Sequence, residues 1–144
     1  MNYLLDTCIL SELIKPNPSQ NVIKWISDID ERCLYISVLT IGEIHKGIEK
    51  LPESKKKENL HKWVKFDLKE RFNNKILDID IHVATTWGEI QAQSERAGQA
   101  LPSIDGLIAS TAIAHDLTVA TRNTKDMKAS GVTLINPWET IEQA

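Results

Sequence analysis

Short apolar runs alternate with longer amphipathic segments along this chain. Residues 3–5, 34–38, 117–120 and 132–135 are short apolar runs, which predict buried strands. Residues 75–79 are either a further strand or an extended connector. Between these runs, apolar residues recur at spacings of three and four, which predicts helices with one buried face.

The first helices are bounded by typical start and stop residues. A helical turn or two over 9–14 is stopped by two prolines, and Ser19 opens the next helix. A helix over 40–51 carries an apolar stripe and ends before Pro52. A longer helix follows, and its apolar residues repeat every four positions, at Leu60, Val64, Leu68 and Phe72.

Two further helices complete the pattern. We predict the first over 81–97, ended by Gly98, with an inward face made by Ala84, Trp87 and Ile90. We predict the second over 106–115, capped by Ser103 or Asp105. It is apolar on nearly all sides, so it should be buried.

Strands separated by helices indicate βαβ units. The chain of 144 residues fits one domain, which we place at 1–138, followed by a short tail over 139–144. The predicted fold is therefore a single α/β domain with a central, mostly parallel sheet and helices on both faces. In such sheets, ligands bind at the carboxyl ends of the strands, where the strand order reverses.

Four acidic residues lie at these strand ends or at helix starts: Asp6, Glu43, Asp105 and Asp126. Because the carboxyl ends of parallel strands share one edge of the sheet, we expect the four carboxylates to converge. Like charges at close range are unfavourable unless a cation offsets them. Mg²⁺ and Mn²⁺ prefer oxygen ligands, and such a site suits hydrolysis of a phosphodiester.

Each acid also has a structural interpretation. Thr40 and Glu43 match a capping box, and Asp105 is a candidate N-cap. Asp6 is a candidate cap for the turn after its strand, and Asp126 a candidate for a turn or a helix start. The set as a whole favours the metal site, because no Lys or Arg lies close in sequence to Asp6 or Asp105 to balance its charge.

The charge distribution is uneven. The net charge is −3, which argues against a simple electrostatic nucleic-acid binder, yet residues 46–75 carry ten Lys/Arg against five Asp/Glu. This basic segment is either a solvated helix face or a surface that holds a polyanion near the metal pocket. In the second interpretation, Lys46 and Lys50 lie one and two helical turns beyond Glu43, on the approach to the pocket.

Other classes of function and location find little support. We expect a cytoplasmic protein, because no apolar stretch is long enough to span a membrane and no signal peptide is visible. Cys8 and Cys33 are interpreted as free thiols. No CxxC or HxxxH spacing occurs, so a dedicated zinc site is not expected, and no glycine-rich nucleotide loop is present.

Four segments in order resemble PIN-domain proteins. They are YLLDT at 3–7, TIGEI at 40–44, IDGLIA at 104–109 and TRNTKD at 121–126. The similarity is greatest to VapC-type toxins of toxin–antitoxin modules, including the FitB-like branch, which the ending INPW at 135–138 also resembles. Where Asn123 stands, the family often has Asp.

The resemblance implies a Mg²⁺- or Mn²⁺-dependent endoribonuclease whose acids map onto the four carboxylates. Its pocket neighbours would be Thr7 and Asn123, with Arg122, Lys46 and Lys50 added here as candidate contacts to RNA. It also implies a homodimer, or a hetero-oligomer with a small VapB-like antitoxin whose other half binds operator DNA. No membrane partner is expected, because the sequence contains no membrane span.

A different class of function stays open at this point. The chain is alternatively a non-catalytic α/β binding or signalling module, either a degenerate PIN domain or a receiver-like domain. A receiver needs an acidic pair after its first strand and an Asp after a middle strand, whereas Asp6 is single and the run 34–38 ends without Asp. A degenerate PIN domain would lack one or more of the four acids, and all four are present.

Overall fold

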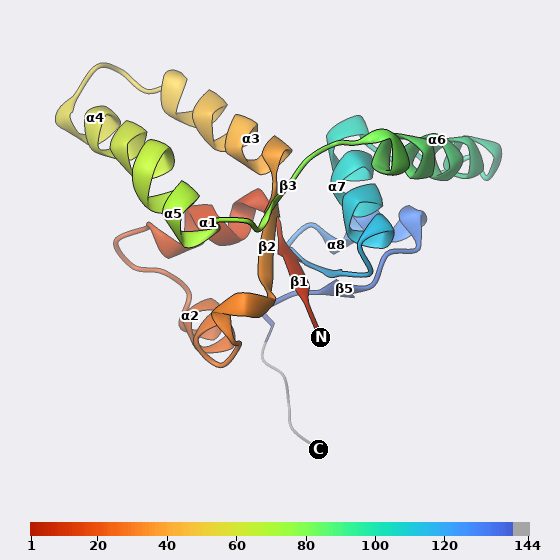
Figure 1. Ribbon diagram of the computed structural model, residues 1–144, viewed down its shortest axis with the longest axis horizontal. Coiled ribbons are helices and arrows are strands. Elements are labelled where there is room, and N and C mark those ends of the chain that lie inside the picture. Colours follow the sequence, from red (N-terminus) through yellow and green to blue (C-terminus); the bar gives the residue numbers. More distant parts are fainter. Residues whose placement is uncertain (140–144) are drawn as a thin grey trace.

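The computed structural model describes residues 1–139, which form a parallel sheet between two layers of helices (Figure 1). The strands are β1 (Tyr3–Leu5), β2 (Leu34–Ser37), β3 (Ile76–Leu77), β4 (Thr118–Ala120) and β5 (Leu134–Ile135). Their order in the sheet is β3-β2-β1-β4-β5, and every neighbouring pair is parallel. The predicted fold class is confirmed, and 75–79 contains a strand. Except for Glu139, the predicted tail lies outside the described residues.

The helices follow the strands in the alternating order that the sequence predicted. Their bounds are α1 (Thr7–Leu13), α2 (Gln20–Ser27), α3 (Val38–Glu49), α4 (Lys55–Lys62), α5 (Lys69–Arg71), α6 (Ile81–Arg96), α7 (Ser103–Ala114) and α8 (Thr124–Met127). A π-helical segment, η2 (Trp63–Leu68), joins α4 to α5, and two short 3₁₀ turns are η1 (Glu31–Cys33) and η3 (Lys128–Ser130).

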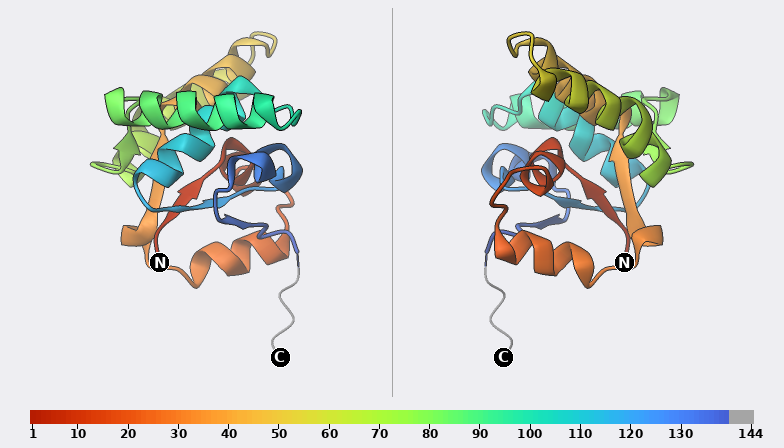
Figure 2. Two further views of the ribbon diagram at one scale, coloured as in Figure 1. Left: turned by 90° about the vertical axis from the view of Figure 1, so that its right-hand side faces the viewer. Right: turned by 90° about the vertical axis from the view of Figure 1, so that its left-hand side faces the viewer.

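Two separate hydrophobic cores cover the two faces of the sheet. Side chains alternate across a strand, so Leu5 belongs to the core under α1, α2, α3 and η2, and Leu4 to the core under α7 and α8. Both leucines are fully buried. Helix α6 packs on α7 as an outer layer (Figures 1 and 2). Strand β1 is therefore buried on both faces and is the centre of the domain.

The four-residue repeat after Pro52 is explained by the π-helical segment. In an α-helix, residues four apart drift around the axis because one turn takes 3.6 residues. The wider π-helical turn over Trp63–Leu68 compensates for this drift. Val64, Leu68 and Phe72 therefore all reach the core, with exposed fractions of 7%, 2% and 0%.

Some helix details differ from the prediction. Helix α7 begins at Ser103, and Pro102 occupies the N-cap position, so neither Ser103 nor Asp105 is the cap. On α6 Ala84 is exposed, and Val83 is the buried residue of that turn. Gly98 does end α6, with a positive φ of 68° that favours glycine.

The strand order also excludes one alternative. Receiver domains have the order 2-1-3-4-5, whereas this sheet has 3-2-1-4-5. The receiver-like interpretation is therefore wrong. Cys8 and Cys33 are free, as predicted, and no helix within residues 1–139 has the length and apolar character needed to cross a membrane.

Candidate active site

Asp6 lies where the strand order reverses. It directly follows β1, whose two neighbours are β2 and β4, and its backbone N–H donates to the carbonyl oxygen of Ala120 at 3.0 Å. Only 4% of its surface is exposed. This is the edge of the sheet at which parallel α/β folds bind ligands.

Both oxygens of the Asp6 carboxylate are held in place. The backbone N–H of Thr7 donates to Oδ1 at 2.8 Å, which makes Asp6 the N-cap of α1. The Thr121 hydroxyl donates to Oδ2 at 2.8 Å, and the Cys8 thiol lies 3.9 Å from the same oxygen. Burial raises the pKa of Asp6; the two threonine bonds oppose this, and nearby Glu43 adds to it.

Glu43 reaches the same place from α3. It lies in the second turn of that helix, and its Oε1 accepts a hydrogen bond of 2.7 Å from the Thr7 hydroxyl. Thr7 therefore connects the two acids, since its backbone N–H binds Asp6 and its side chain binds Glu43. Asp6 is buried and Glu43 is exposed, so the pair spans from the interior to the surface.

Asp105 joins the group from the first turn of α7. Its pKa is raised from 3.8 to about 6, first by burial and then by the charges of Asp6, Asp126 and Glu43. The charges of three other acids thus act on Asp105, and the convergence of all four carboxylates into one metal site stays a prediction. Within residues 1–139, no Lys, Arg or His forms an ion pair with any of the four.

The comparison with known families agrees with this arrangement of acids. The family model that describes the PIN domain matches residues 3–130. This chain belongs to the PIN-domain family. The predicted resemblance is confirmed, since its relatives include FitB- and VapC-type toxins.

Three curated relatives match almost the whole chain. Plasmid stability protein StbB of Pseudomonas syringae is 36% identical over 94% of this chain and 98% of its own length. Toxin FitB of Neisseria gonorrhoeae is 36% identical over 94% of this chain and 97% of its own length. VapC ribonuclease Y4jK of Sinorhizobium fredii is 32% identical over 94% and 97%.

Solved structures give the same result. The structure of FitAcB from Neisseria gonorrhoeae superposes with a TM-score of 0.91, at 35% identity over 96% of this chain and 99% of that one. The structure of FitAB bound to an IR36 DNA fragment has a TM-score of 0.92, at 33% identity over 99% of both chains.

Two structural interpretations of the acids in this PIN domain are wrong. The hydroxyl of Ser37, not of Thr40, caps α3 by accepting from the backbone N–H of Leu39 at 3.0 Å. Thr40 is instead buried inside the first turn, and its hydroxyl has no hydrogen-bond partner among the described residues. The capping box with Glu43 is therefore absent, and Asp105 makes no capping bond.

Thr121 is a site residue to which the sequence assigned no role. Its hydroxyl is fully buried, donates to Asp6 and accepts from the backbone N–H of Asn123 at 2.9 Å. A threonine directly after the strand beside β1 was the signal for it. Asn123 stands at the N-cap of α8, the helix that contains Asp126, and makes no side-chain capping bond.

Arg122 contacts Trp138 and Glu12 and forms no ion pair with the four acids within residues 1–139. Its guanidinium lies 4.2 Å from the centre of the Trp138 ring, and its Nη2 lies 3.5 Å from Glu12 Oε1. Glu12 is buried and also accepts from Lys15, from the backbone of Ser19 and from Trp138. These contacts attach the segment that follows β5 to α1.

The basic segment is divided in the structure. Lys46 and Lys50 are exposed and make no ion pair within residues 1–139. Lys57 is buried, with a side chain 9% exposed, and its Nζ binds the carbonyl oxygens of Glu49 and Leu51. Lys57 therefore caps the end of α3 and is not available to a ligand.

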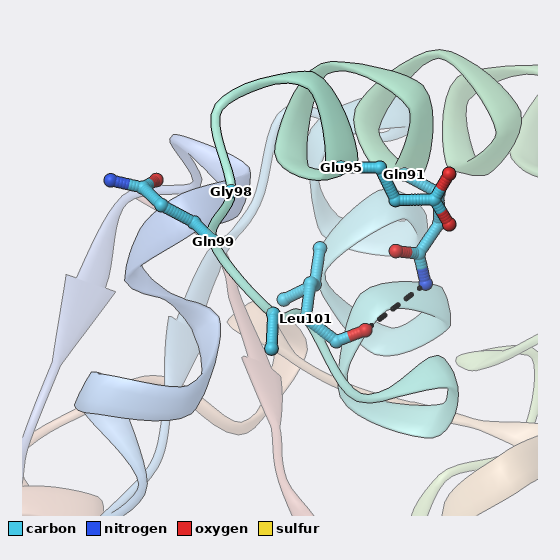
Figure 3. Close-up of a pocket in the computed structure, with 6 residues that line it drawn as sticks. Gln91, Glu95, Gly98, Gln99 and Leu101 are labelled. Atoms are coloured by element: carbon cyan, nitrogen blue, oxygen red, sulfur yellow. Dashed lines mark hydrogen bonds between the residues drawn. The ribbon is translucent and has the colours of Figure 1, made fainter.

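A pocket opens beside the loop between α6 and α7 (Figure 3). In it, the Gln91 side chain donates to the carbonyl oxygen of Leu101 at 3.3 Å. The pocket contains none of the four carboxylates; its lining residues are Gln91, Glu95, Gly98, Gln99, Ala100 and Leu101. The hydrogen bond from Gln91 to Leu101 holds the loop that leads into α7, and α7 carries Asp105. The pocket therefore affects the site only through the position of this helix.

Proposed function

We propose that this chain is a Mg²⁺- or Mn²⁺-dependent endoribonuclease and the toxin of a toxin–antitoxin pair. The observation that carries the proposal is that Thr7 binds both Asp6 and Glu43 at the carboxyl edge of the sheet, beside Asp105, whose pKa nearby acidic charges help to raise to about 6. The family supports it, because relatives of similar length are named as a toxin and as a ribonuclease. The catalytic and metal-binding residues in this proposal are Asp6, Glu43, Asp105 and Asp126.

The donor set of this site fits a hard divalent cation. It offers carboxylate oxygens, which suit Mg²⁺ and Mn²⁺, and no ion pair offsets their charge within residues 1–139. The acids do not form a compact set of three ligand atoms in the described part of the chain. Waters would thus complete the shell of an ion held here, as is usual for Mg²⁺.

When bound, the ion would supply a nucleophilic hydroxide and stabilise charge on the phosphate. The chain's own residues provide the positioning. Thr121 and Thr7 fix Asp6 in one orientation, and Thr7 holds Glu43 beside it. Asp105 and Asp126 lie on α7 and α8, which cover the other face of the sheet, so both helical layers contribute acids to the proposed site. In this proposal Asn123, at the N-cap position of α8, is a further polar neighbour of the acids.

The substrate in this proposal is RNA, bound in part by the exposed lysines of α3. Lys46 and Lys50 lie three and seven residues after Glu43, so they share its side of the helix. Neither makes an ion pair in the described residues, so each ammonium is free to contact a phosphate. Arg122 contributes less to RNA binding here than the sequence suggested, because Glu12 and Trp138 engage its guanidinium.

We also infer that this chain forms a homodimer and binds a small VapB-like antitoxin. In the complex, only the antitoxin contacts operator DNA. The support is the solved complex of FitAB with DNA, whose toxin resembles this chain at a TM-score of 0.92. The outer helices add support, because Ile81, Ile104 and Ile113 on α6 and α7 are 86%, 42% and 39% exposed. Exposed isoleucines in one layer favour a protein partner.

The test is RNA cleavage by purified protein, with sequencing of the RNA ends after induced expression. Asp6→Asn keeps the shape but removes one charge, so cleavage should fall by roughly a hundredfold or more. Asp78→Asn, an exposed acid outside the group, is the matched control. Undiminished cleavage in excess EDTA would refute the metal dependence. A folded chain that cleaves no RNA with Mg²⁺ or Mn²⁺ would identify a degenerate, non-catalytic PIN domain.

A further inference from the structure

A second group of metal-ligating side chains lies between α3 and α4, away from the carboxylates. His45 and Glu49 are four residues apart on α3, and His61 faces them from α4, which packs beside α3 (Figure 1). One ligand atom from each lies within 4.8 Å of the others. Glu49 Oε1 is 3.1 Å from His61 Nε2 and 3.9 Å from His45 Nε2.

We propose that His45, Glu49 and His61 bind a transition-metal ion, with Zn²⁺ as the ion of choice. Two imidazoles and one carboxylate are a frequent set of protein ligands for Zn²⁺, with water at the fourth position. Tetrahedral bonds of about 2.0–2.2 Å place ligand atoms roughly 3.4 Å apart. The three side chains therefore need to move by only about 1 Å to bind the ion.

The exposure of these side chains permits that movement. His45 and Glu49 are 58% and 54% exposed, and His61 is 37% exposed. The two imidazole rings are tilted by 55° with centroids 5.7 Å apart, so they are not stacked face to face. The nearby Lys57 ammonium binds the backbone carbonyl of Glu49 at 3.4 Å. The charge of this ammonium weakens cation binding at the site.

This site is chemically and spatially distinct from the acidic pocket. His45 follows Glu43 by two residues, which is about 200° around a helix, so the two side chains leave α3 on opposite sides. Imidazole ligands select Zn²⁺ over Mg²⁺, whereas carboxylates favour Mg²⁺. An ion bound here would join the helix that carries Glu43 to α4. Each helix contributes only one histidine, and the two are sixteen residues apart, so no metal-binding sequence motif revealed the site.

The test uses protein without a histidine tag, treated with EDTA and then exchanged into buffer. Zn²⁺ is titrated by calorimetry, and Tm is measured with and without Zn²⁺. At a tenfold excess of free Zn²⁺ over Kd, binding should raise Tm by about 4 °C. His61→Ala and His45→Ala should each abolish this rise. His82→Ala, an exposed histidine on α6, is the matched control and should keep it.

A further variant separates this site from the acidic pocket. Asp6→Asn should lose RNA cleavage under the proposed function but keep the rise in Tm caused by Zn²⁺. Because the inference does not depend on nuclease activity, an inactive wild type leaves it testable. It is overturned if Zn²⁺ does not change Tm, or if His45→Ala and His61→Ala bind as many Zn²⁺ ions per chain as the wild type does.

Discussion

Replacing Asp105 with Asn should stabilise the metal-free protein at neutral pH. The pKa of Asp105 is about 6 in the folded chain, against 3.8 as the ordinary value, because burial and three nearby carboxylates disfavour its charge. For an acid whose pKa is raised on folding, stability falls as pH rises from the unfolded to the folded pKa. The charge therefore costs stability at pH 7.5 and costs nothing well below pH 4.

The size of the effect follows from the competing contributions. A pKa change of about two corresponds to about 3 kcal/mol. Asp105 is only half-buried, so solvent screening reduces this to roughly half. The lost attraction between its charge and the N-terminus of α7 removes another ~0.3–1 kcal/mol. Asp105→Asn should therefore gain about 1 kcal/mol, which for a chain of this length is a rise in Tm of about 3 °C.

The assay is thermal unfolding in EDTA at pH 7.5 and at the lowest pH at which the protein still unfolds cooperatively. The gain should be present at pH 7.5 and shrink as the pH approaches 4. Asp78→Asn, which removes an exposed charge, should show no such difference. With Mg²⁺ present, the Tm of the wild type should rise relative to that of Asp105→Asn, because the ion offsets the charge of Asp105. An Asp105→Asn protein that melts below wild type at pH 7.5 in EDTA would show that the group does not carry repulsive charge.

Three further predictions concern α3 and its ends. Thr40→Val removes a buried hydroxyl without a partner and should raise stability by up to about 1 kcal/mol, whereas Ser37→Ala removes the real cap and should lower it by about 1 kcal/mol; chemical denaturation measures both. Lys57→Met removes the donor to the last carbonyls of α3 and should lower stability by about 1–3 kcal/mol, with an unchanged Tm as the contrary result. Reversing the charges of Lys46 and Lys50 should weaken RNA binding and flatten its dependence on salt, and an unchanged slope of log affinity against log salt would assign both lysines to a solvated face.

The position of the candidate site could be predicted from the sequence, because it depends on the order of strands and helices along the chain. Alternating strands and helices place strand ends on one edge of the sheet, and Asp6, Glu43, Asp105 and Asp126 each lie at such an end or near a helix start. The start of α3 was not accessible in the same way. Ser37 is both the last residue of β2 and the N-cap of α3. Because it lies inside the apolar run 34–38, it was assigned to the strand, and the helix was predicted to begin at residue 40 instead of Val38.

Features that depend on contacts distant in sequence were also missed. The role of Thr121 arises because Ala120 pairs with Leu5, which brings its hydroxyl to Asp6 across 115 residues of sequence. The burial of Lys57 depends on how the chain turns between α3 and α4, and its charge suggested an exposed position. Local periodicity carries no information on either contact.

The central position of β1 has a consequence for the order in which the protein is made. Residues 3–5 pair with residues 118–120, so β1 gains one of its two neighbours only after more than a hundred further residues are synthesised. At about 5–20 residues per second, that delay is on the order of 6–20 s. During this time Asp6 lacks Thr121, and Leu4 lacks the core on its side of the sheet. The group of four acids can therefore assemble only after the segment that contains Thr121 and Asp126 has left the ribosome.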